Sequence, residues 1–274
     1  MAPPLRNVRR QLSQGRIFWR EVGHQGPTLI FLHGSWQTSS QWLPLLEQLG
    51  DTHHCFAPDL LGFGDSEHPK VSYSIELETE CLAELVEALH LRDVYLVGHS
   101  LGGWIAASYG LKYLDRVKGL ILIAPEGVET QNLRGRWRWA RWLVGNPPLL
   151  AWAMQVLAPL AKLFGLSKAV ARAHQLRRRL LASPTACRLL FKRRRAEIES
   201  EMVQEQLGWL KVPALIVQGD DGANETARLN QAYVSALPKA DLKVLAGSDE
   251  DLPETCADPM ASLITMFVAT CKPL

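Results

Sequence analysis

Residues 94–103 read VYLVGHSLGG, and this stretch decides the fold. A short apolar run, Val94–Val97, leads directly into the pattern Gly-x-Ser-x-Gly and then into a helical segment. A turn of this kind holds its serine in a strained conformation at the carboxyl edge of a sheet, while the flanking glycines let the backbone pack closely. The first amides of the helix add positive partial charge at the same point. The pattern therefore predicts that Ser100 is a nucleophile.

The rest of the chain alternates short apolar runs with amphipathic stretches. The runs predict strands at Arg16–Glu21, Thr28–Leu32, His54–Ala57, Val94–Val97, Val117–Ala124, Val212–Val217 and Leu242–Leu245. Helices are expected at Ser39–Leu49, Ser74–Leu91, 101–110, 225–236 and 258–270. Strands that alternate with crossover helices form a parallel sheet covered on both faces. The predicted fold class is therefore α/β, with a mostly parallel, doubly wound sheet.

Composition excludes several classes of protein. With 274 residues, 47% of them hydrophobic and 21% charged, the chain can bury a sizeable core and is not disordered, collagenous or coiled coil. No run of about 18 apolar residues predicts a membrane span, and no apolar segment follows the basic N-terminus as in a secretory signal. Five widely spaced cysteines without a Cys-x-x-Cys pair are typical of a reducing compartment. We therefore expect a cytoplasmic protein.

Charge is distributed unevenly along the chain. Residues 132–195 hold 15 of the 30 Lys and Arg residues and no Asp or Glu, so all 28 acidic residues lie elsewhere. The strand pattern stops over the same interval, where Gly and Pro separate helical stretches. We predict an all-helical, Trp- and Arg-rich cap at 127–206, inserted into a core made of 1–126 and 207–274. Its basic surface fits either a solvated cap over an apolar pocket or peripheral contact with an anionic membrane. Nucleic acid is not an expected partner, because no binding motif accompanies the charge.

Several motifs occur in the order that one known superfamily uses. They are Gly98–Gly103 (GHSLGG), His33–Trp36 (HGSW) after the strand Thr28–Leu32, Asp59–Ser66 (DLLGFGDS) and Val212–Asp221 (VPALIVQGDD). Together they resemble the α/β-hydrolase superfamily, in its capped esterase, lipase and haloperoxidase-like branch. The resemblance covers nearly the whole chain outside the cap. It implies an α/β-hydrolase fold in which the cap roofs the active site and sets substrate choice.

The resemblance also implies roles for individual residues. The backbone N–H groups of Ser35 and Leu101 would form the oxyanion hole, and His33, Trp36 and His99 would lie at the substrate pocket. In this family the loop Asp59–Ser66 shapes the pocket rim and has no catalytic role. No metal or cofactor is implied.

The catalytic acid and base depart from the family pattern. The acid is expected just after Gly219, where Asp221 is favoured over Asp220. The family then places a Gly-His pair after the strand Leu242–Leu245, but here Asp249 and Glu250 stand in those positions. The last histidine in the chain is His174, inside the predicted cap. Imidazole titrates near neutral pH, whereas a glutamate with a pKa of about 4.3 is a much weaker base.

Two functions remain open. One is a serine hydrolase that acts on an ester, or a related acyl compound, of a largely apolar small molecule or lipid. Its catalysis would be weak or unconventional, with the base supplied by Glu250, by His174 or by the substrate. The other is a degenerate hydrolase that binds a ligand, a partner or a membrane surface without turnover. The intact Gly-x-Ser-x-Gly turn favours the first, and the missing imidazole favours the second.

Overall fold

The computed structural model describes residues 3–128, 138–145, 167–221, 224–247 and 251–271. The chain divides into two compact units, one of Met1–Thr130 with Glu201–Leu274 and the other of Gln131–Ser200. The second unit falls inside the interval 127–206 that the sequence singles out as a cap.

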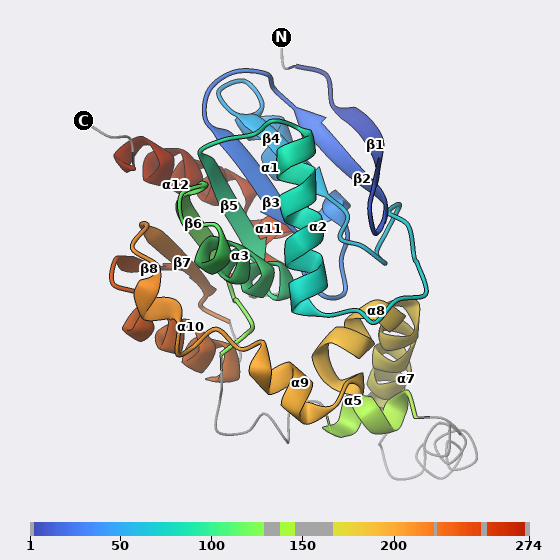
Figure 1. The fold of residues 1–274 in the computed structure, drawn as a ribbon. Helices are drawn as coiled ribbons and strands as arrows, with labels where there is room; N and C mark the ends of the chain where they lie inside the picture. Colours follow the sequence, from blue (N-terminus) through green and yellow to red (C-terminus); the bar gives the residue numbers. More distant parts are fainter. Residues whose placement is uncertain (1–2, 129–137, 146–166, 222–223, 248–250, 272–274) are drawn as a thin grey trace. The chain divides into compact units, whose positions relative to one another are not determined.

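The first unit is built on one sheet of eight strands. The strands are β1 (Arg6–Leu12), β2 (Gly15–Val22), β3 (Thr28–Leu32), β4 (His54–Pro58), β5 (Val94–His99), β6 (Val117–Ile123), β7 (Ala214–Gly219) and β8 (Ala240–Leu245). Their spatial order is β1-β2-β4-β3-β5-β6-β7-β8 (Figure 1). Only the β1–β2 and β2–β4 pairs are antiparallel. The predicted mostly parallel α/β fold is therefore confirmed.

Helices cover both faces of this sheet (Figure 1). One face packs against α1 (Leu43–Leu49), α11 (Leu252–Thr255) and α12 (Ala257–Thr270), whose apolar side chains share one core with the sheet. The other face carries α2 (Ile75–Ala88), α3 (Leu101–Lys112) and α10 (Asn224–Ala236). Short 3₁₀ turns, η1 (Ser39–Trp42) and η3 (Leu207–Trp209), precede α1 and β7. The first helix was expected to begin at Ser39 as its cap, but Thr38 is the capping residue and a 3₁₀ turn comes first.

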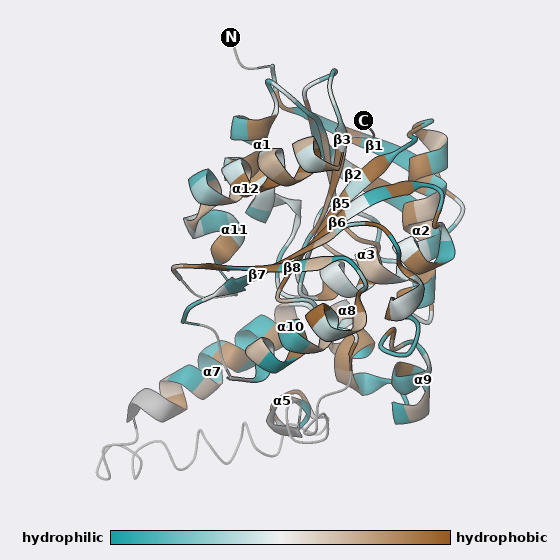
Figure 2. Cartoon of the chain, turned by 90° about the vertical axis from the view of Figure 1, so that its left-hand side faces the viewer, coloured by the Kyte–Doolittle hydropathy of each residue, from teal (hydrophilic) through white to brown (hydrophobic). Residues whose placement is uncertain are grey.

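The strands in the middle of the sheet are apolar and buried on both faces. Figure 2 shows them in brown between helices whose outer faces are teal. Every residue of β5 is buried, as is every residue of β3 except the first. Strands buried on both faces are continuous apolar runs, which is why the sequence locates them. The edge strand β1 was not expected, because its sequence RNVRRQL is polar and mostly exposed.

Every described element of the second unit is a helix. These elements are α5 (Arg138–Leu143), α7 (Ser167–Ala182), α8 (Pro184–Cys187), a π-helical turn (Arg188–Lys192) and α9 (Arg195–Ser200). Within this unit, Arg177 Nε on α7 donates to the carbonyl of Leu143 on α5 at 3.2 Å. In the part of the chain that the structure describes, no helix combines the length and apolarity that a membrane span requires.

One buried carboxyl on α2 makes the stability of the fold depend on pH. Glu78 is 1% exposed, and its Oε2 accepts a hydrogen bond from the Leu61 N–H at 3.1 Å. Burial raises the pKa of Glu78 to about 8. The pKa of this carboxyl is therefore higher in the folded protein than in the unfolded chain. At a pH between these two values, Glu78 is protonated in the folded protein and ionised in the unfolded chain. Stability from this group is complete below the unfolded pKa and is lost as the pH rises toward about 8.

We predict that Glu78→Gln removes this pH dependence. Wild-type protein should lose up to about 1.4 kcal/mol of unfolding free energy per pH unit between pH 5.5 and 7.5 from this group alone. The glutamine variant should be less sensitive over the same interval, as measured by urea unfolding at both pH values. Glu76→Gln, at an exposed glutamate of the same helix, is the matched control and should behave as wild type. Equal pH slopes for wild type and Glu78→Gln would contradict the prediction.

Candidate active site

Ser100 lies on a sharp turn between a strand and a helix. It follows β5 directly, precedes α3, and has φ 50° and ψ −110°, a left-handed conformation that is costly for a residue with a Cβ. Its N–H donates to the carbonyl of Ile123 in β6 at 2.9 Å. Its carbonyl accepts from the N–H groups of Gly103 at 3.0 Å and Glu126 at 3.1 Å. Two neighbouring segments thus hold the turn, and Ser100 remains partly exposed.

Two glycines make this turn possible by letting backbones approach. A Cβ on Gly98 would lie 2.4 Å from the carbonyl oxygen of Gly102. A Cβ on Gly102 would lie 2.2 Å from the carbonyl oxygen of Leu32, at the end of β3. Both distances are far below van der Waals contact, and the obstructing atoms are backbone. The glycines therefore bring the start of α3 against the end of β3.

The expected oxyanion residues follow neighbouring strands. In the β3–β5 pair Leu32 lies beside Gly98, so Ser35 and Leu101 both follow the carboxyl edge of the sheet. Leu101 is the first residue of α3, and an N–H at that position has no acceptor within its own helix. Ser35 is 3% exposed, and its Oγ has no hydrogen-bond partner among the described residues. Both residues thus follow adjacent strands at this edge, and their role as oxyanion donors stays a prediction.

His33 is a buried side chain that connects two backbone segments. The ring is completely buried; its Nδ1 lies 2.9 Å from the Gly34 carbonyl, and its Nε2 accepts from the Leu60 N–H at 3.0 Å. A carbonyl only accepts, so the proton is on Nδ1 and the ring is neutral. Burial also lowers the pKa of His33. Although His33 was expected at the substrate pocket, its ring faces the protein interior and joins two loops.

His99 and Trp36 take different positions around the same loop. His99 is 5% exposed, and its ring packs on Gly34, where a Cβ would come within 2.8 Å of Nδ1. Trp36 is half-buried and directly follows Ser35. Of the three expected pocket residues, His33, Trp36 and His99, Trp36 is therefore the most exposed.

Gln41 is a further residue of this loop that the sequence did not single out. Its Oε1 accepts from the Gly34 N–H at 3.3 Å and lies 3.5 Å from His99 Nδ1. The side chain therefore links the backbone at Gly34 to the residue before Ser100. A polar residue at the start of a helix carries no sequence signal for such a role.

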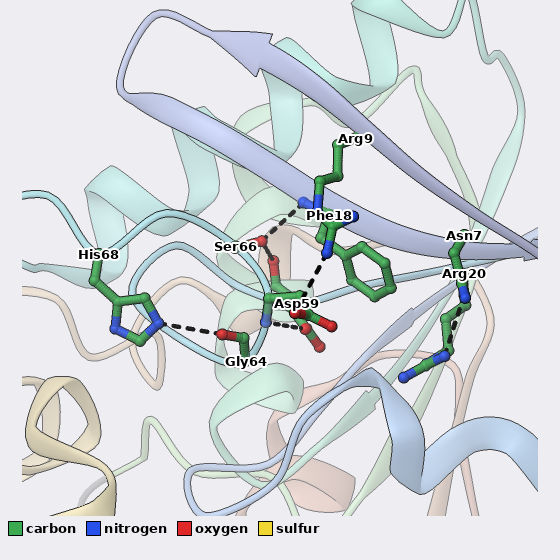
Figure 3. A network of polar contacts seen from close by, with 9 residues as sticks. Asn7, Arg9, Phe18, Arg20, Asp59, Gly64, Ser66 and His68 are labelled. Atoms are coloured by element: carbon green, nitrogen blue, oxygen red, sulfur yellow. Dashed lines mark hydrogen bonds and ion pairs between the residues drawn. The ribbon is translucent and has the colours of Figure 1, made fainter.

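The loop Asp59–Ser66 is held by its own carboxylate. Asp59 Oδ1 accepts from the Ser39 N–H at 2.6 Å, and Oδ2 accepts from the Asp65 N–H at 2.7 Å. Ser66 Oγ donates to the Asp59 carbonyl at 2.6 Å and accepts from the Phe18 N–H at 2.9 Å, which ties the loop to β2 (Figure 3). All these contacts are internal, in accordance with the structural role that the family pattern implies.

The expected acid lies on an exposed turn after β7. Asp220 Oδ1 accepts from the Gly247 N–H at 2.7 Å, and the Asp221 N–H donates to the Gly247 carbonyl at 3.1 Å. Of the two carboxylates, Asp220 thus contacts the segment that follows β8, although Asp221 was the favoured candidate. Glu250 and Asp249 lie outside the described residues.

The backbone of a further acidic residue, Glu126, contacts the turn at Ser100. Glu126 follows β6, is 8% exposed, and donates its N–H to the carbonyl of Ser100. Its own carbonyl accepts from the Tyr233 hydroxyl at 2.5 Å. The signal was present in the sequence, since Pro125-Glu126-Gly127 directly follows a strand that neighbours β5. In the described part of the chain, no three His, Cys, Asp or Glu side chains form a group suited to a metal ion.

A match to a protein family covers most of the chain. A family model described as "Alpha/beta hydrolase family" matches residues 29–263. The chain belongs to the α/β-hydrolase family. Solved structures similar to this α/β-hydrolase include a membrane phospholipase A, with a TM-score of 0.73 and 21% identity over 98% of this chain and 87% of that chain. The enol-lactonase from Burkholderia xenovorans LB400 has a TM-score of 0.72 and 18% identity over 96% of this chain and 100% of that chain.

Relatives by sequence cover less of this α/β-hydrolase. The protein named 1-acylglycerol-3-phosphate O-acyltransferase ABHD5 from Rattus norvegicus is 41% identical over 126 residues, which are 43% of this chain and 36% of that protein. A Mycobacterium tuberculosis protein, Rv2715, is 28% identical over 165 residues, 60% of this chain and 48% of that protein. The chain therefore spans less than half the length of these relatives.

We predict that Gly102→Ala disrupts the turn that carries Ser100. The added methyl would meet the Leu32 carbonyl, and overpacking of this kind costs about 1–3 kcal/mol of unfolding free energy. Chemical denaturation should show this loss. Gly208→Ala is the matched control, because a Cβ there meets nothing within 4 Å. If both variants unfolded at the wild-type midpoint, the close approach of α3 to β3 would not constrain the fold.

Proposed function

We propose that this α/β-hydrolase cleaves, or transfers the acyl group of, an ester of a largely apolar small molecule or lipid through Ser100. The observation that carries the proposal is the backbone of Ser100, which holds a partly exposed serine at φ 50° beside the first amide of α3. In this mechanism the Ser100 hydroxyl attacks the acyl carbon. The N–H groups of Leu101 and Ser35 would then stabilise the negative charge on the carbonyl oxygen.

The substrate class is supported by the neighbours and by composition. A phospholipase and a lactonase, both among the similar structures, are named for the cleavage of carboxylic ester bonds. The predicted cap contains the stretch LLAWAMQVLAPLAKLF at 149–164, whose apolar character suits a pocket for an apolar acyl chain. This stretch lies outside the described residues.

The proton acceptor distinguishes this protein from an ordinary serine hydrolase. All histidines lie at or before position 174, and His33 is fixed with both nitrogens on backbone groups. Carboxylates remain: Glu126 beside the turn, Asp220 after β7, and Glu250 after β8. Losing an imidazole base costs on the order of 10⁶ in turnover in serine proteases, while oxyanion donors and binding leave roughly 10³–10⁴ over water. We therefore propose slow turnover with a carboxylate, His174 or the substrate as base.

We predict that a fluorophosphonate probe labels the protein and that Ser100→Ala abolishes the labelling. Hydrolysis of p-nitrophenyl esters should fall at least about tenfold in the same variant, because the covalent step is lost. If a carboxylate is the base, the rate should persist below about pH 6, where an imidazole base would be protonated. Ser40→Ala, at an exposed serine of η1, is the control. Labelling that survives in Ser100→Ala would contradict the assignment.

A second function, ligand binding without turnover, is favoured by His33, because both of its ring nitrogens are bonded to backbone groups and neither is free to act as a base. If wild type shows neither labelling nor turnover, Asp249→Gly combined with Glu250→His should create activity, because the family pattern places imidazole there. Activity that appears only in this double variant would support the degenerate binder. Activity of wild type that disappears in Ser100→Ala would support the enzyme.

Peripheral membrane contact through the second unit is also proposed. Three large apolar side chains on it are exposed: Trp142 on α5 by 62%, and Leu176 and Leu181 on α7 by 42% and 48%. The two leucines lie one helical turn from exposed Arg172 and Arg178 respectively. Arginine beside exposed apolar side chains is typical of helices that bind the interface of anionic lipid. The five cysteines are free thiols, which accords with a cytoplasmic location for such contact.

We predict that the protein co-sediments with vesicles that contain phosphatidylserine and less with vesicles of phosphatidylcholine alone. Added salt should weaken the interaction, because it screens the attraction to anionic headgroups. Arg172→Glu combined with Arg178→Glu should reduce the bound fraction several-fold. Arg92→Glu, at an exposed cation of the first unit, is the charge-matched control. Binding that is indifferent to lipid charge would remove this proposal.

A further inference from the structure

The last strand of the sheet is exposed along its length. In the part of the chain that the structure describes, β8 pairs only with β7 and forms one edge of the sheet (Figure 1). Its residues 241–244 are all exposed, including Leu242 at 37% and Val244 at 55%. An exposed edge strand with apolar side chains presents unpaired backbone groups to another strand. The edge of β8 is therefore a surface for strand addition.

The direction of its backbone groups can be assigned from the contacts with β7. The Ala214 N–H donates to the Lys239 carbonyl at 2.8 Å, and the Asp220 N–H donates to the Leu245 carbonyl at 2.9 Å. Odd-numbered residues thus direct their backbone groups toward β7. Because strand residues alternate in direction, Ala240, Leu242 and Val244 direct N–H and C=O groups away from the sheet. These three residues are the ones available to a new strand.

The side chains of β8 make this edge complementary to itself. Asp241 and Lys243 are both exposed and flank Leu242 on either side. Neither forms an ion pair with another residue in the described part of the chain. The other edge of the sheet, β1, carries Arg6, Arg9 and Arg10 but no acidic residue, and Arg6 and Arg9 already pair with Glu21 and Asp65. Unpaired charges of both signs, which a second copy could match, are therefore found on β8 and not on β1.

We propose that two copies of this chain associate through antiparallel pairing of their β8 strands, centred on Leu242. In this register Leu242 exchanges hydrogen bonds with Leu242 of the partner subunit. Ala240 exchanges them with the partner's Val244. Asp241 then lies opposite the partner's Lys243, and the two-fold symmetry produces this pair twice. It is a non-hydrogen-bonded pair, in which the Cα atoms of opposite residues are closer than in a hydrogen-bonded pair. A register centred on Asp241 would oppose two aspartates, and one centred on Lys243 would oppose two lysines. Charge thus favours the register centred on Leu242 over both of these.

Charge reversal tests this register with the full-length chain. Sedimentation velocity should show a dimer for wild type, and Asp241→Lys and Lys243→Asp should each raise the dissociation constant at least about tenfold, because each places like charges opposite one another twice. The double variant Asp241→Lys/Lys243→Asp should restore the dimer. An equimolar mixture of the two single variants should form a heterodimer, since it pairs lysines with aspartates only. These rescues also show that the single variants are folded.

A backbone variant tests the pairing independently of charge. Leu242→Pro removes an N–H that points away from β7, so it should leave the β7–β8 ladder intact and abolish the dimer. Thermal unfolding checks that its fold is retained. A wild type that stays monomeric at high micromolar concentration would overturn the proposal. So would a dimer that tolerates Leu242→Pro and both charge reversals, or single variants that fail to associate when mixed.

Discussion

The site depends on the absence of side chains where β5, α3 and β3 meet. Gly98 and Gly102 let three backbones approach to distances that no Cβ permits, and this contact fixes the turn that carries Ser100. A residue with a Cβ in so sparsely populated a conformation costs about 1–3 kcal/mol, so the turn persists only because surrounding contacts determine it. The hydrogen bonds of Ser100 with Ile123 and Glu126 supply those contacts, and both partners belong to the segment around the end of β6.

The groups at the carboxyl edge of the sheet fall into two kinds. His33 and Asp59 are buried and bonded to backbone, so replacing either would leave buried donors without acceptors and would cost stability. Asp220 and Asp221 are exposed on a turn after β7. Exposed residues such as these two aspartates can be replaced with little effect on folding. The chain has no histidine after position 174, so the fold does not require an imidazole in the segments that follow β7 and β8.

Much of the core could be predicted from the sequence, because strands buried on both faces must be apolar throughout, as β5 is. The edge strand β1 could not, since its arginines face solvent and only pairing with β2 makes it a strand. The same limit applies to the site. Ser100 is identifiable because its turn needs local glycines. Gln41 acquires its role only through tertiary contact with Gly34, and that contact leaves no local pattern.

The identity of residue 100 bears on whether the site is catalytic. Packing requires glycines at 98 and 102, but it does not require serine between them. At φ 50° and ψ −110° glycine would avoid the steric cost that a Cβ brings. A chain shaped by stability alone would therefore place another residue at the turn. Serine at this position provides a hydroxyl in spite of the steric cost of the conformation. The hydroxyl lies beside a helix N-terminus, which stabilises negative charge. This is the arrangement expected where the hydroxyl reacts, so the strain at Ser100 favours the enzyme over the binding protein.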